Sequence, residues 1–319
     1  MSAAVVEAPA TEAPVAAAPR AGRARRPIAA LGALPLGVWM LLFFLLPFVL
    51  IVWYSFGEKP DLYTTHSNAT LSLARYGQAL SPTFLTIFLR TLKIAVVGTV
   101  LALVIAFPMA YWMAAVVRPQ RRGLILGLVL VPYWTNFLVR TLGWEVILGG
   151  DGVLSHLLQA VGITGAPLHI IDTPAAVQIG VVYNYLPLMI LPIYVALERI
   201  DGSLLEASRD LGAGAFATFR SVTVPLAFPG VIGGLLLVFV PLMGDYITPS
   251  VLGGASGSMV AQMVASQFTN AQNWALGSAM AILLMLSIFG VTACAGGVLA
   301  ALGWLIRRPT RLRLGGAAA

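Results

Sequence analysis

Residues 198–225 read ERIDGSLLEASRDLGAGAFATFRSVTVP, and this polar stretch lies between two long apolar runs. Asp201-Gly202 is a turn signal. Ser203, with Glu206 three residues later, forms the capping-box pattern that predicts a helix start. The stretch therefore predicts a helix that lies outside a membrane while both flanking runs cross it.

The end of that helix can also be read from the sequence. Gly212 suits a left-handed C-terminal cap. A second short helix is expected through Phe216 and Phe219, and it should end before Pro225. The first helix would have an apolar side made of Leu204, Leu205, Ala207 and Leu211. Such a helix–turn–helix could insert into a groove on a partner protein.

The composition of the whole chain excludes most soluble classes. Of 319 residues, 59% are hydrophobic and only 10% are charged, whereas soluble domains have about 25% charged residues. The mean hydropathy is +0.90. An ordinary soluble enzyme or a nucleic-acid binder is therefore not expected, and the single cysteine, Cys294, excludes a disulfide within the chain.

Six apolar runs are expected to cross the membrane, because each approaches the about 20 residues that a bilayer core requires. They are residues 32–55, 94–117, 123–148, 173–197, 226–244 and 276–306. Arg140 and Glu145 interrupt the third run. Residues 253–273 are predicted to be a polar loop, with room for a short interfacial helix. The expected fold class is an all-α membrane protein with six transmembrane helices.

The basic residues predict the orientation. Fourteen of the nineteen Lys and Arg residues lie in the N-terminal tail, the second and fourth loops, and the C-terminal tail. Positive residues favour the cytoplasmic side, so both termini are expected in the cytoplasm. Residues 1–27 form a predicted disordered tail, residues 28–308 the six-span domain with its loop at 198–225, and residues 309–319 a cytoplasmic tail.

The loop resembles a motif of ABC importer permeases, which approximates E-A-A-x3-G-x9-I-x-L-P. The matching positions are Glu206, Ala207, Ser208, Gly212, Val222, Val224 and Pro225. The departures at Ser208, Val222 and Val224 keep small size or apolar character. The chain is similar to the spermidine/putrescine-type subfamily in five further segments: residues 132–141, 146–152, 241–249, 252–254 and 268–274.

The resemblance implies a type I importer-like bundle in a bacterial inner membrane, with coupling helices that dock into a dimer of ATP-binding subunits. The implied coupling residues are Ser203, Leu205, Glu206, Ala207, Asp210, Gly212, Phe216, Phe219 and Pro225. ATP and Mg would bind the partner subunits, and no cofactor or metal is expected in this chain. A second, similar but distinct permease and an extracytoplasmic solute-binding protein would complete the system. Glu206 either contacts a partner arginine or only caps its own helix.

Candidate pathway residues lie in or beside the spans, where polar groups are costly. They are Tyr133, Asn136, Tyr183, Asn184, Asp245 and Tyr246. Asp245 could hold a cation beside Tyr246, or it could be a water-exposed residue at the outer end of the span. Tyr183 and Asn184 could instead form hydrogen bonds inside the bundle. Arg140 and Glu145 could simply be an interfacial pair that extends outward.

The sequence reveals neither a site for ATP hydrolysis nor another catalytic site. A phosphate-binding loop needs a lysine after glycine, and neither Lys59 nor Lys93 follows one. The expected function is therefore the permease half of an ATP-driven importer, with polyamine as the first candidate solute and iron, thiamine or opine-like solutes as alternatives. A secondary transporter driven by an ion gradient is the alternative from a different class.

Overall fold

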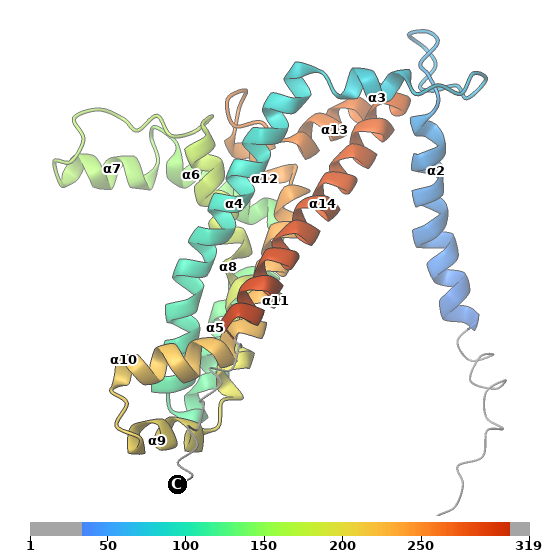
Figure 1. Ribbon diagram of the computed structural model, residues 1–319. Helices are drawn as coiled ribbons and strands as arrows, with labels where there is room; N and C mark the ends of the chain where they lie inside the picture. Colours follow the sequence, from blue (N-terminus) through green and yellow to red (C-terminus); the bar gives the residue numbers. More distant parts are fainter. Residues whose placement is uncertain (1–33, 307–319) are drawn as a thin grey trace, which may run out of the picture. The chain divides into compact units, whose positions relative to one another are not determined.

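The computed structural model describes residues 34–306, which are helical apart from turns, loops and one isolated bridge between Glu58 and Ser67 (Figure 1). The predicted tails, residues 1–27 and 309–319, lie outside the described residues. The chain divides into two units, Met1–Leu50 and Ile51–Ala319. The first described helix runs over Leu34–Ser55 and includes a π-helical turn, η2 (Leu41–Leu45), followed by α2 (Leu46–Ser55).

The second unit holds the remaining helices. In chain order these are α3 (Ala74–Ala79), α4 (Pro82–Tyr111), η3 (Trp112–Val116), α5 (Pro119–Trp134), α6 (Phe137–Leu148), α7 (Val153–Ala160), α8 (Pro174–Glu198), α9 (Gly202–Asp210), α10 (Ala215–Thr218), η4 (Phe219–Thr223), α11 (Val224–Met243), α12 (Ile247–Leu252), α13 (Val260–Thr269) and α14 (Trp274–Ile306). Within the described residues, five helices are long and apolar enough to cross a membrane, and a bent pair would make a sixth.

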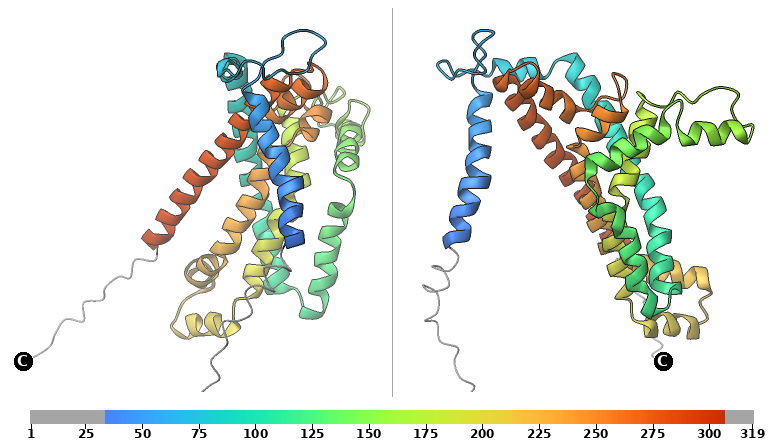
Figure 2. Two further views of the ribbon diagram at one scale, coloured as in Figure 1. Left: turned by 90° about the vertical axis from the view of Figure 1, so that its right-hand side faces the viewer. Right: turned by 180° about the vertical axis from the view of Figure 1, so that it is seen from behind.

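Helices α4, α8 and α11 pack against one another at the centre of this unit (Figure 2). The buried face of α4 carries alanines at intervals of about one or two turns: Ala95, Ala102, Ala106 and Ala110. On α11, Gly230 lies so close to α8 that a side chain there would meet the Pro192 carbonyl oxygen at 2.5 Å, and Gly234 would meet Met189. Small residues permit such close approach between membrane helices.

The second span begins twelve residues before the charge-free run at Ile94. The Ser81 hydroxyl accepts a hydrogen bond from the Phe84 amide at 3.3 Å, and Pro82 occupies the first helical turn. With η3, this helix covers 35 residues, or about 52 Å at 1.5 Å per residue. It is longer than the hydrocarbon core, which is about 30 Å thick.

The prediction of one continuous third span is wrong. Helix α5 and the following segment Phe137–Ala160 meet at a bend of 87°. Thr135 and Asn136 both leave the helical region, with ψ angles of 152° and 137°. The Asn136 side chain then accepts a hydrogen bond from the Leu138 amide at 2.8 Å and starts α6. The apolar run continues across this break, which explains why hydropathy alone does not reveal it.

The fifth span also differs from its prediction, because it starts at Ala215 and not near Leu226. Helices α10, η4 and α11 form one continuous helix of 29 residues, Ala215–Met243. The expected helix end before Pro225 does not occur. A π turn lies just before the proline, where the Val224 amide donates to the Phe219 carbonyl, and such turns occur mostly as single-turn bulges inside α-helices. The fourth span, Pro174–Glu198, agrees with its predicted range.

The loops expected on the cytoplasmic side, between η3 and α5 and around α9, lie at the same end of the second unit (Figure 1). At the opposite end, the segment before α3 is fixed to the turn between α13 and α14. There the Trp274 amide donates to the Thr65 carbonyl at 3.1 Å, and Lys59 Nζ donates to the Ala271 carbonyl at 2.8 Å. The predicted polar region 253–273 contains the short helix α13.

Candidate coupling and pathway sites

Helix α9, at the centre of the predicted coupling loop, starts with a cap different from the one expected. Asp201 is the N-cap, and its carboxylate accepts a hydrogen bond from the Ser203 amide at 3.0 Å. This hydrogen bond lowers the pKa of the exposed Asp201 carboxyl. Ser203 lies inside the first turn and forms no capping box with Glu206. Asp201 precedes Ser203 and takes the N-cap position, so the helix begins two residues earlier than predicted.

The end of α9 follows the expected pattern. Gly212 has φ +83°, in the left-handed region. Its amide donates to the Arg209 carbonyl at 2.8 Å, and the Ala213 amide donates to the Ser208 carbonyl at 3.1 Å. Carbonyls at the helix end are thereby satisfied. The Ser208 and Thr218 hydroxyls lie 3.0 Å apart and connect α9 to α10.

Helices α9 and α10, with the turn that joins them, expose large apolar side chains. Leu204 is 47% exposed, Leu211 is 89% exposed and Phe216 is 75% exposed. Glu206, Ala207 and Asp210 are also exposed, whereas Leu205 is half-buried. We call Leu204, Leu211 and Phe216 the apolar coupling residues. Large apolar side chains exposed on a polar loop are typical of a surface that another protein covers.

A cavity of about 480 Å³ lies between α9 and the ends of the neighbouring helices. Leu205 and Arg209 line one side of it, and Tyr111 and Arg122 line another. Phe219, at the start of η4, also lines it and packs edge-on against Tyr111, with ring centroids 5.5 Å apart. It packs in the same way against Phe107 at 6.0 Å. Phe219 therefore connects the coupling loop to the end of the second span.

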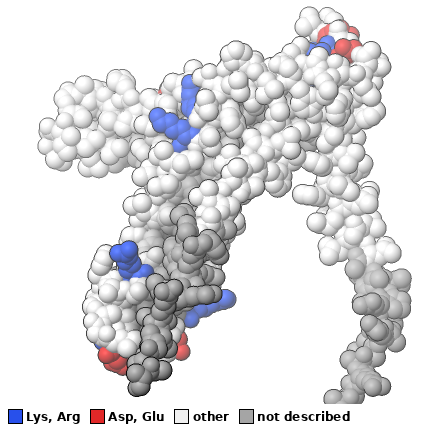
Figure 3. Space-filling model, viewed as in Figure 1, with Lys and Arg blue, Asp and Glu red and all other residues white. Residues whose placement is uncertain are grey.

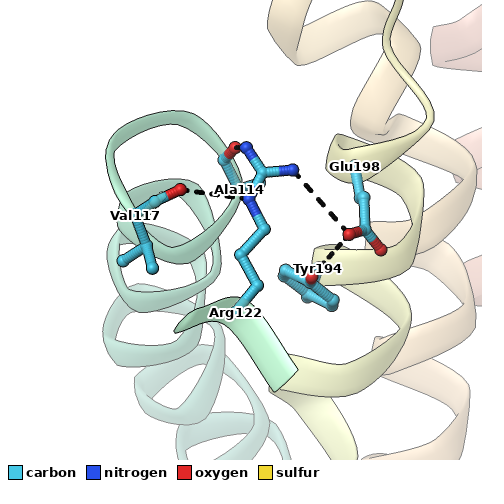
Figure 4. Close-up of polar contacts among 5 residues, drawn as sticks. All are labelled: Ala114, Val117, Arg122, Tyr194 and Glu198. Carbon is cyan, nitrogen blue, oxygen red and sulfur yellow. Dashed lines mark hydrogen bonds and ion pairs between the residues drawn. The ribbon is translucent and has the colours of Figure 1, made fainter. Parts of the chain in front are cut away.

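Arg122 forms the second connection at this end (Figure 4). Its Nη2 donates to the Ala114 carbonyl at 2.6 Å and its Nε donates to the Val117 carbonyl at 3.1 Å. Its Nη1 lies 3.8 Å from Glu198 Oε1, which also accepts a hydrogen bond from the Tyr194 hydroxyl at 2.7 Å. This is the one ion pair among residues 34–306. No functional role was predicted for Arg122 or Glu198 from the sequence, although both are charged residues at the ends of apolar runs.

Three of the six predicted pathway residues, Tyr133, Asn136 and Asn184, lie around Arg140. Its guanidinium carbon lies 5.4 Å from the Tyr133 ring centroid and 5.5 Å from that of Phe137, and Nη1 donates to the Asn184 carbonyl at 3.4 Å. Asn136 lies at the break between these two rings. The Asn184 side chain is buried and donates to the Thr141 hydroxyl at 3.1 Å. The expectation of an Arg140–Glu145 pair is wrong, because Arg140 turns inward to α8.

The remaining three pathway residues do not join this group. Tyr183 packs edge-on against Trp144 of α6, with ring centroids 5.4 Å apart. Tyr246 is 52% exposed and lines an apolar groove of about 430 Å³ between α11, α13 and α14. Asp245 is only 5% exposed, so the expectation of a water-exposed residue at the outer end of the span is wrong.

Asp245 is held by the start of α12. One carboxylate oxygen accepts hydrogen bonds from the Ile247 and Thr248 amides, at 3.0 and 3.1 Å, and the other accepts from the Thr248 hydroxyl. These contacts are those of a helix cap. Among residues 34–306 no Lys or Arg forms an ion pair with Asp245. These contacts hold the carboxylate at the α11–α12 turn, and a role of Asp245 in the pathway stays a prediction.

The distribution of charge agrees with a membrane location. On the face of the second unit shown in Figure 3, charged side chains lie toward its two ends and a broad uncharged surface lies between them. The described residues contain no group of three or more His, Cys, Asp or Glu that could hold a metal ion. The surface between the ends carries many exposed large apolar side chains, as lipid contact requires.

The chain belongs to the family of binding-protein-dependent transport system inner membrane components, whose model matches residues 27–302. It is therefore a permease subunit of an ABC importer, a multi-pass inner membrane protein and a transport component, not an enzyme.

Among relatives, the chain is 39% identical over 244 residues to the spermidine/putrescine transport system permease protein PotB of Haemophilus influenzae, covering 76% of this chain and 84% of that protein. It is 37% identical to PotB of Escherichia coli, covering 77% and 88%. It is also 34% identical to the inner membrane ABC transporter permease protein YdcU of Escherichia coli, covering 68% and 72%.

Solved structures show the same fold at low sequence identity. One chain of a bacterial ABC transporter that imports the acidic polysaccharide alginate matches with a TM-score of 0.68 at 13% identity, covering 86% of this chain and 95% of that one. A chain of the MetNI methionine ABC transporter matches with a TM-score of 0.51 at 17% identity, covering 70% and 99%. These similarities support the type I importer permease architecture.

Proposed function

We propose that this chain forms half of the membrane pathway of an importer for polyamines such as spermidine and putrescine. The observation that carries the solute class is 37–39% identity to spermidine/putrescine permeases over about three quarters of the chain. Exposed acids at the end opposite α9 support a cationic solute. They are Glu145, Asp151 and Asp172. Acidic side chains around an entrance raise the local concentration of cations.

In this proposal, the loop 198–225 docks on a dimer of cytoplasmic ATP-binding subunits. The apolar coupling residues would enter a groove on that partner, and Glu206 is exposed beside them for a charge-assisted contact. ATP and Mg would bind the partner, and this chain would supply no nucleotide site. Both termini and α9 would then lie on the cytoplasmic side, as the positive residues predict.

The complete transporter would contain a second, similar but distinct permease and an extracytoplasmic solute-binding protein. Binding of ATP would close the ATP-binding subunits and move α9, and the pathway would then open outward to accept solute. Hydrolysis would return it to the inward-open state. This alternation between states is a shift between conformations that bind the partners differently.

The experiment for the solute is uptake of labelled spermidine by the complete transporter in proteoliposomes. Unlabelled putrescine should compete, whereas iron and thiamine should not. Efficient competition by iron or thiamine, with none by putrescine, would reassign the solute and leave the importer class unchanged.

The experiment for the coupling site is co-purification of this permease with its ATP-binding subunits. Leu211→Asp with Phe216→Asp should abolish the association, because each places a charge in an apolar contact. The matched control is Leu124→Asp, which places the same charge at an exposed apolar position of α5, outside residues 198–225. Retained association in the double variant would contradict the docking role. Transport by the purified chain alone under a proton or sodium gradient would instead favour a secondary transporter.

A further inference from the structure

We propose that Arg122 is a positioning residue for energy coupling, which transfers movement of the coupling loop to the second and third spans. The inference rests on the proposed docking of residues 198–225, and it assigns a role to a residue outside that loop. Figure 4 shows the contacts that carry it: one guanidinium reaches Ala114, Val117 and Glu198 at the same time.

The contacts of Arg122 join three helix ends. Arg122 itself lies in the first turn of α5. Ala114 belongs to η3 and Val117 is its C-cap, so both carbonyls come from the end of the second span. The last carbonyls of a helix have no partner within that helix, and two guanidinium donors satisfy them here. The third contact, to Glu198, reaches the last residue of α8.

Glu198 is placed where the coupling loop begins. Only residues 199–201 separate it from α9. The Tyr194 hydroxyl donates to the same Glu198 oxygen at 2.7 Å, which fixes the carboxylate on the side of α8 that faces Arg122. A movement of α9 that displaces the end of α8 therefore acts directly on the Arg122 guanidinium.

Helix α9 has few other routes to these spans. It packs against α10 and η4, and the cavity of about 480 Å³ separates it from much of the helix ends above. One route runs through Phe219 to Phe107 and Tyr111, and the other through Glu198 and Arg122. Both routes end on the same part of the second span, between Phe107 and Val117, so we infer that this part receives the movement.

The chemistry requires an arginine. Its planar fork places Nε and both Nη groups in fixed directions, and it can donate to two carbonyls and a carboxylate together. A lysine has the same charge, but its donors radiate from a single nitrogen and cannot span all three acceptors. The Arg122 side chain is 23% exposed and that of Glu198 is 44% exposed, so solvent screens the ion pair in part and the geometry matters more than the charge.

The test uses the complete transporter in proteoliposomes, with spermidine uptake and ATP hydrolysis measured on the same sample. Arg122→Gln should lower uptake on the order of tenfold, as expected when hydrogen bonds from a charged group are lost. ATP hydrolysis and association with the ATP-binding subunits should remain near the unchanged level. The number of ATP molecules hydrolysed per solute would therefore rise, which a merely misfolded permease would not produce.

Three further variants make the result specific. Arg121→Gln is the matched control, since this neighbouring arginine is exposed, and it should transport normally. Glu198→Gln should uncouple less strongly than Arg122→Gln, because an amide oxygen can still accept from Arg122. Arg122→Lys should lower uptake as Arg122→Gln does. Normal uptake in Arg122→Lys would show that the planar guanidinium is not required.

Unchanged ATP use per solute in Arg122→Gln would also overturn the proposal. If the proposed docking on ATP-binding subunits is itself wrong, the unmodified permease will not associate with those subunits at all. This result differs from a change in Arg122→Gln alone. Loss of assembly in Arg122→Gln alone would assign the residue to folding and would count against a positioning role.

Discussion

The guanidinium of Arg140 lies between the rings of Tyr133 and Phe137, which belong to opposite sides of the 87° bend in the third span. The same group donates to the Asn184 carbonyl on α8. One side chain thus holds α5, α6 and α8 together at the place where the chain leaves the helical conformation. A cation at membrane depth is costly, and these contacts offset part of that cost.

Arg140→Leu should therefore destabilise the permease and stop uptake. The loss of two cation–π contacts and one hydrogen bond should cost about 1–3 kcal/mol of unfolding free energy. The measurement is the Tm of the detergent-purified transporter, together with uptake in proteoliposomes. Arg75→Leu, which removes a partly exposed arginine whose side chain donates a hydrogen bond to Gln78, is the control. An unchanged Tm in Arg140→Leu would show that the bend does not depend on this side chain.

Asp245→Ala should lower stability by about 1–2 kcal/mol, the usual cost of losing an N-terminal helix cap. Asp245→Asn should lose less, because its amide oxygen can still accept from the Ile247 and Thr248 amides. Neither variant should change the KM for spermidine, which distinguishes a cap from a solute ligand. A tenfold higher KM in Asp245→Asn at unchanged Tm would restore Asp245 to the pathway.

Gly212→Ala should strain the end of α9, because a side chain at φ +83° costs about 1–2 kcal/mol. No atom lies within 4 Å of the position a Cβ would take, so the cost comes from the backbone alone. Hydrogen exchange of the α9 amides should become faster, and Gly212→Asn should be milder. Gly214→Ala is the control, since Gly214 has φ −67° and equally open surroundings. Equal exchange in the two alanine variants would contradict the left-handed cap.

The Asp201 cap predicts that coupling is insensitive to pH near neutrality. The hydrogen bond from Ser203 lowers the pKa of Asp201 below its ordinary value of 3.8. A carboxyl whose folded pKa is depressed contributes stability above its unfolded pKa, and this is lost as pH falls through the folded pKa. The ratio of uptake in Asp201→Asn to uptake in the unmodified permease should stay constant from about pH 5.5 to 8. A ratio that changes within this range would show that Asp201 titrates there.

The spans and the coupling loop could be predicted because they depend on local composition. Long charge-free runs locate the helices, and Gly212 marks a helix end through its own backbone freedom. The cap at Asp201 was not predicted, because Asp201 and Ser203 are both good caps two residues apart and Glu206 favoured Ser203. The bend at Asn136 was not predictable, because apolar residues continue across it.

The side-chain partners of the charged residues could not be predicted for a different reason. Arg140 meets Asn184 and Arg122 meets Glu198 across more than forty positions of sequence, and only the packing of α4, α5, α6 and α8 brings them together. The π turn at Phe219–Thr223 likewise allows a helix to continue toward Pro225, where sequence rules expect it to stop.

The contact between Gly230 and Pro192 has a consequence for how the transporter changes shape. Because α8 and α11 touch backbone to backbone and the coupling loop also joins them, their separation at that end is fixed. We therefore expect a force on α9 to move the two helices together. The hinge of the transport cycle should therefore lie outside this pair, and we expect it at Thr135–Asn136, where the chain leaves the helical conformation.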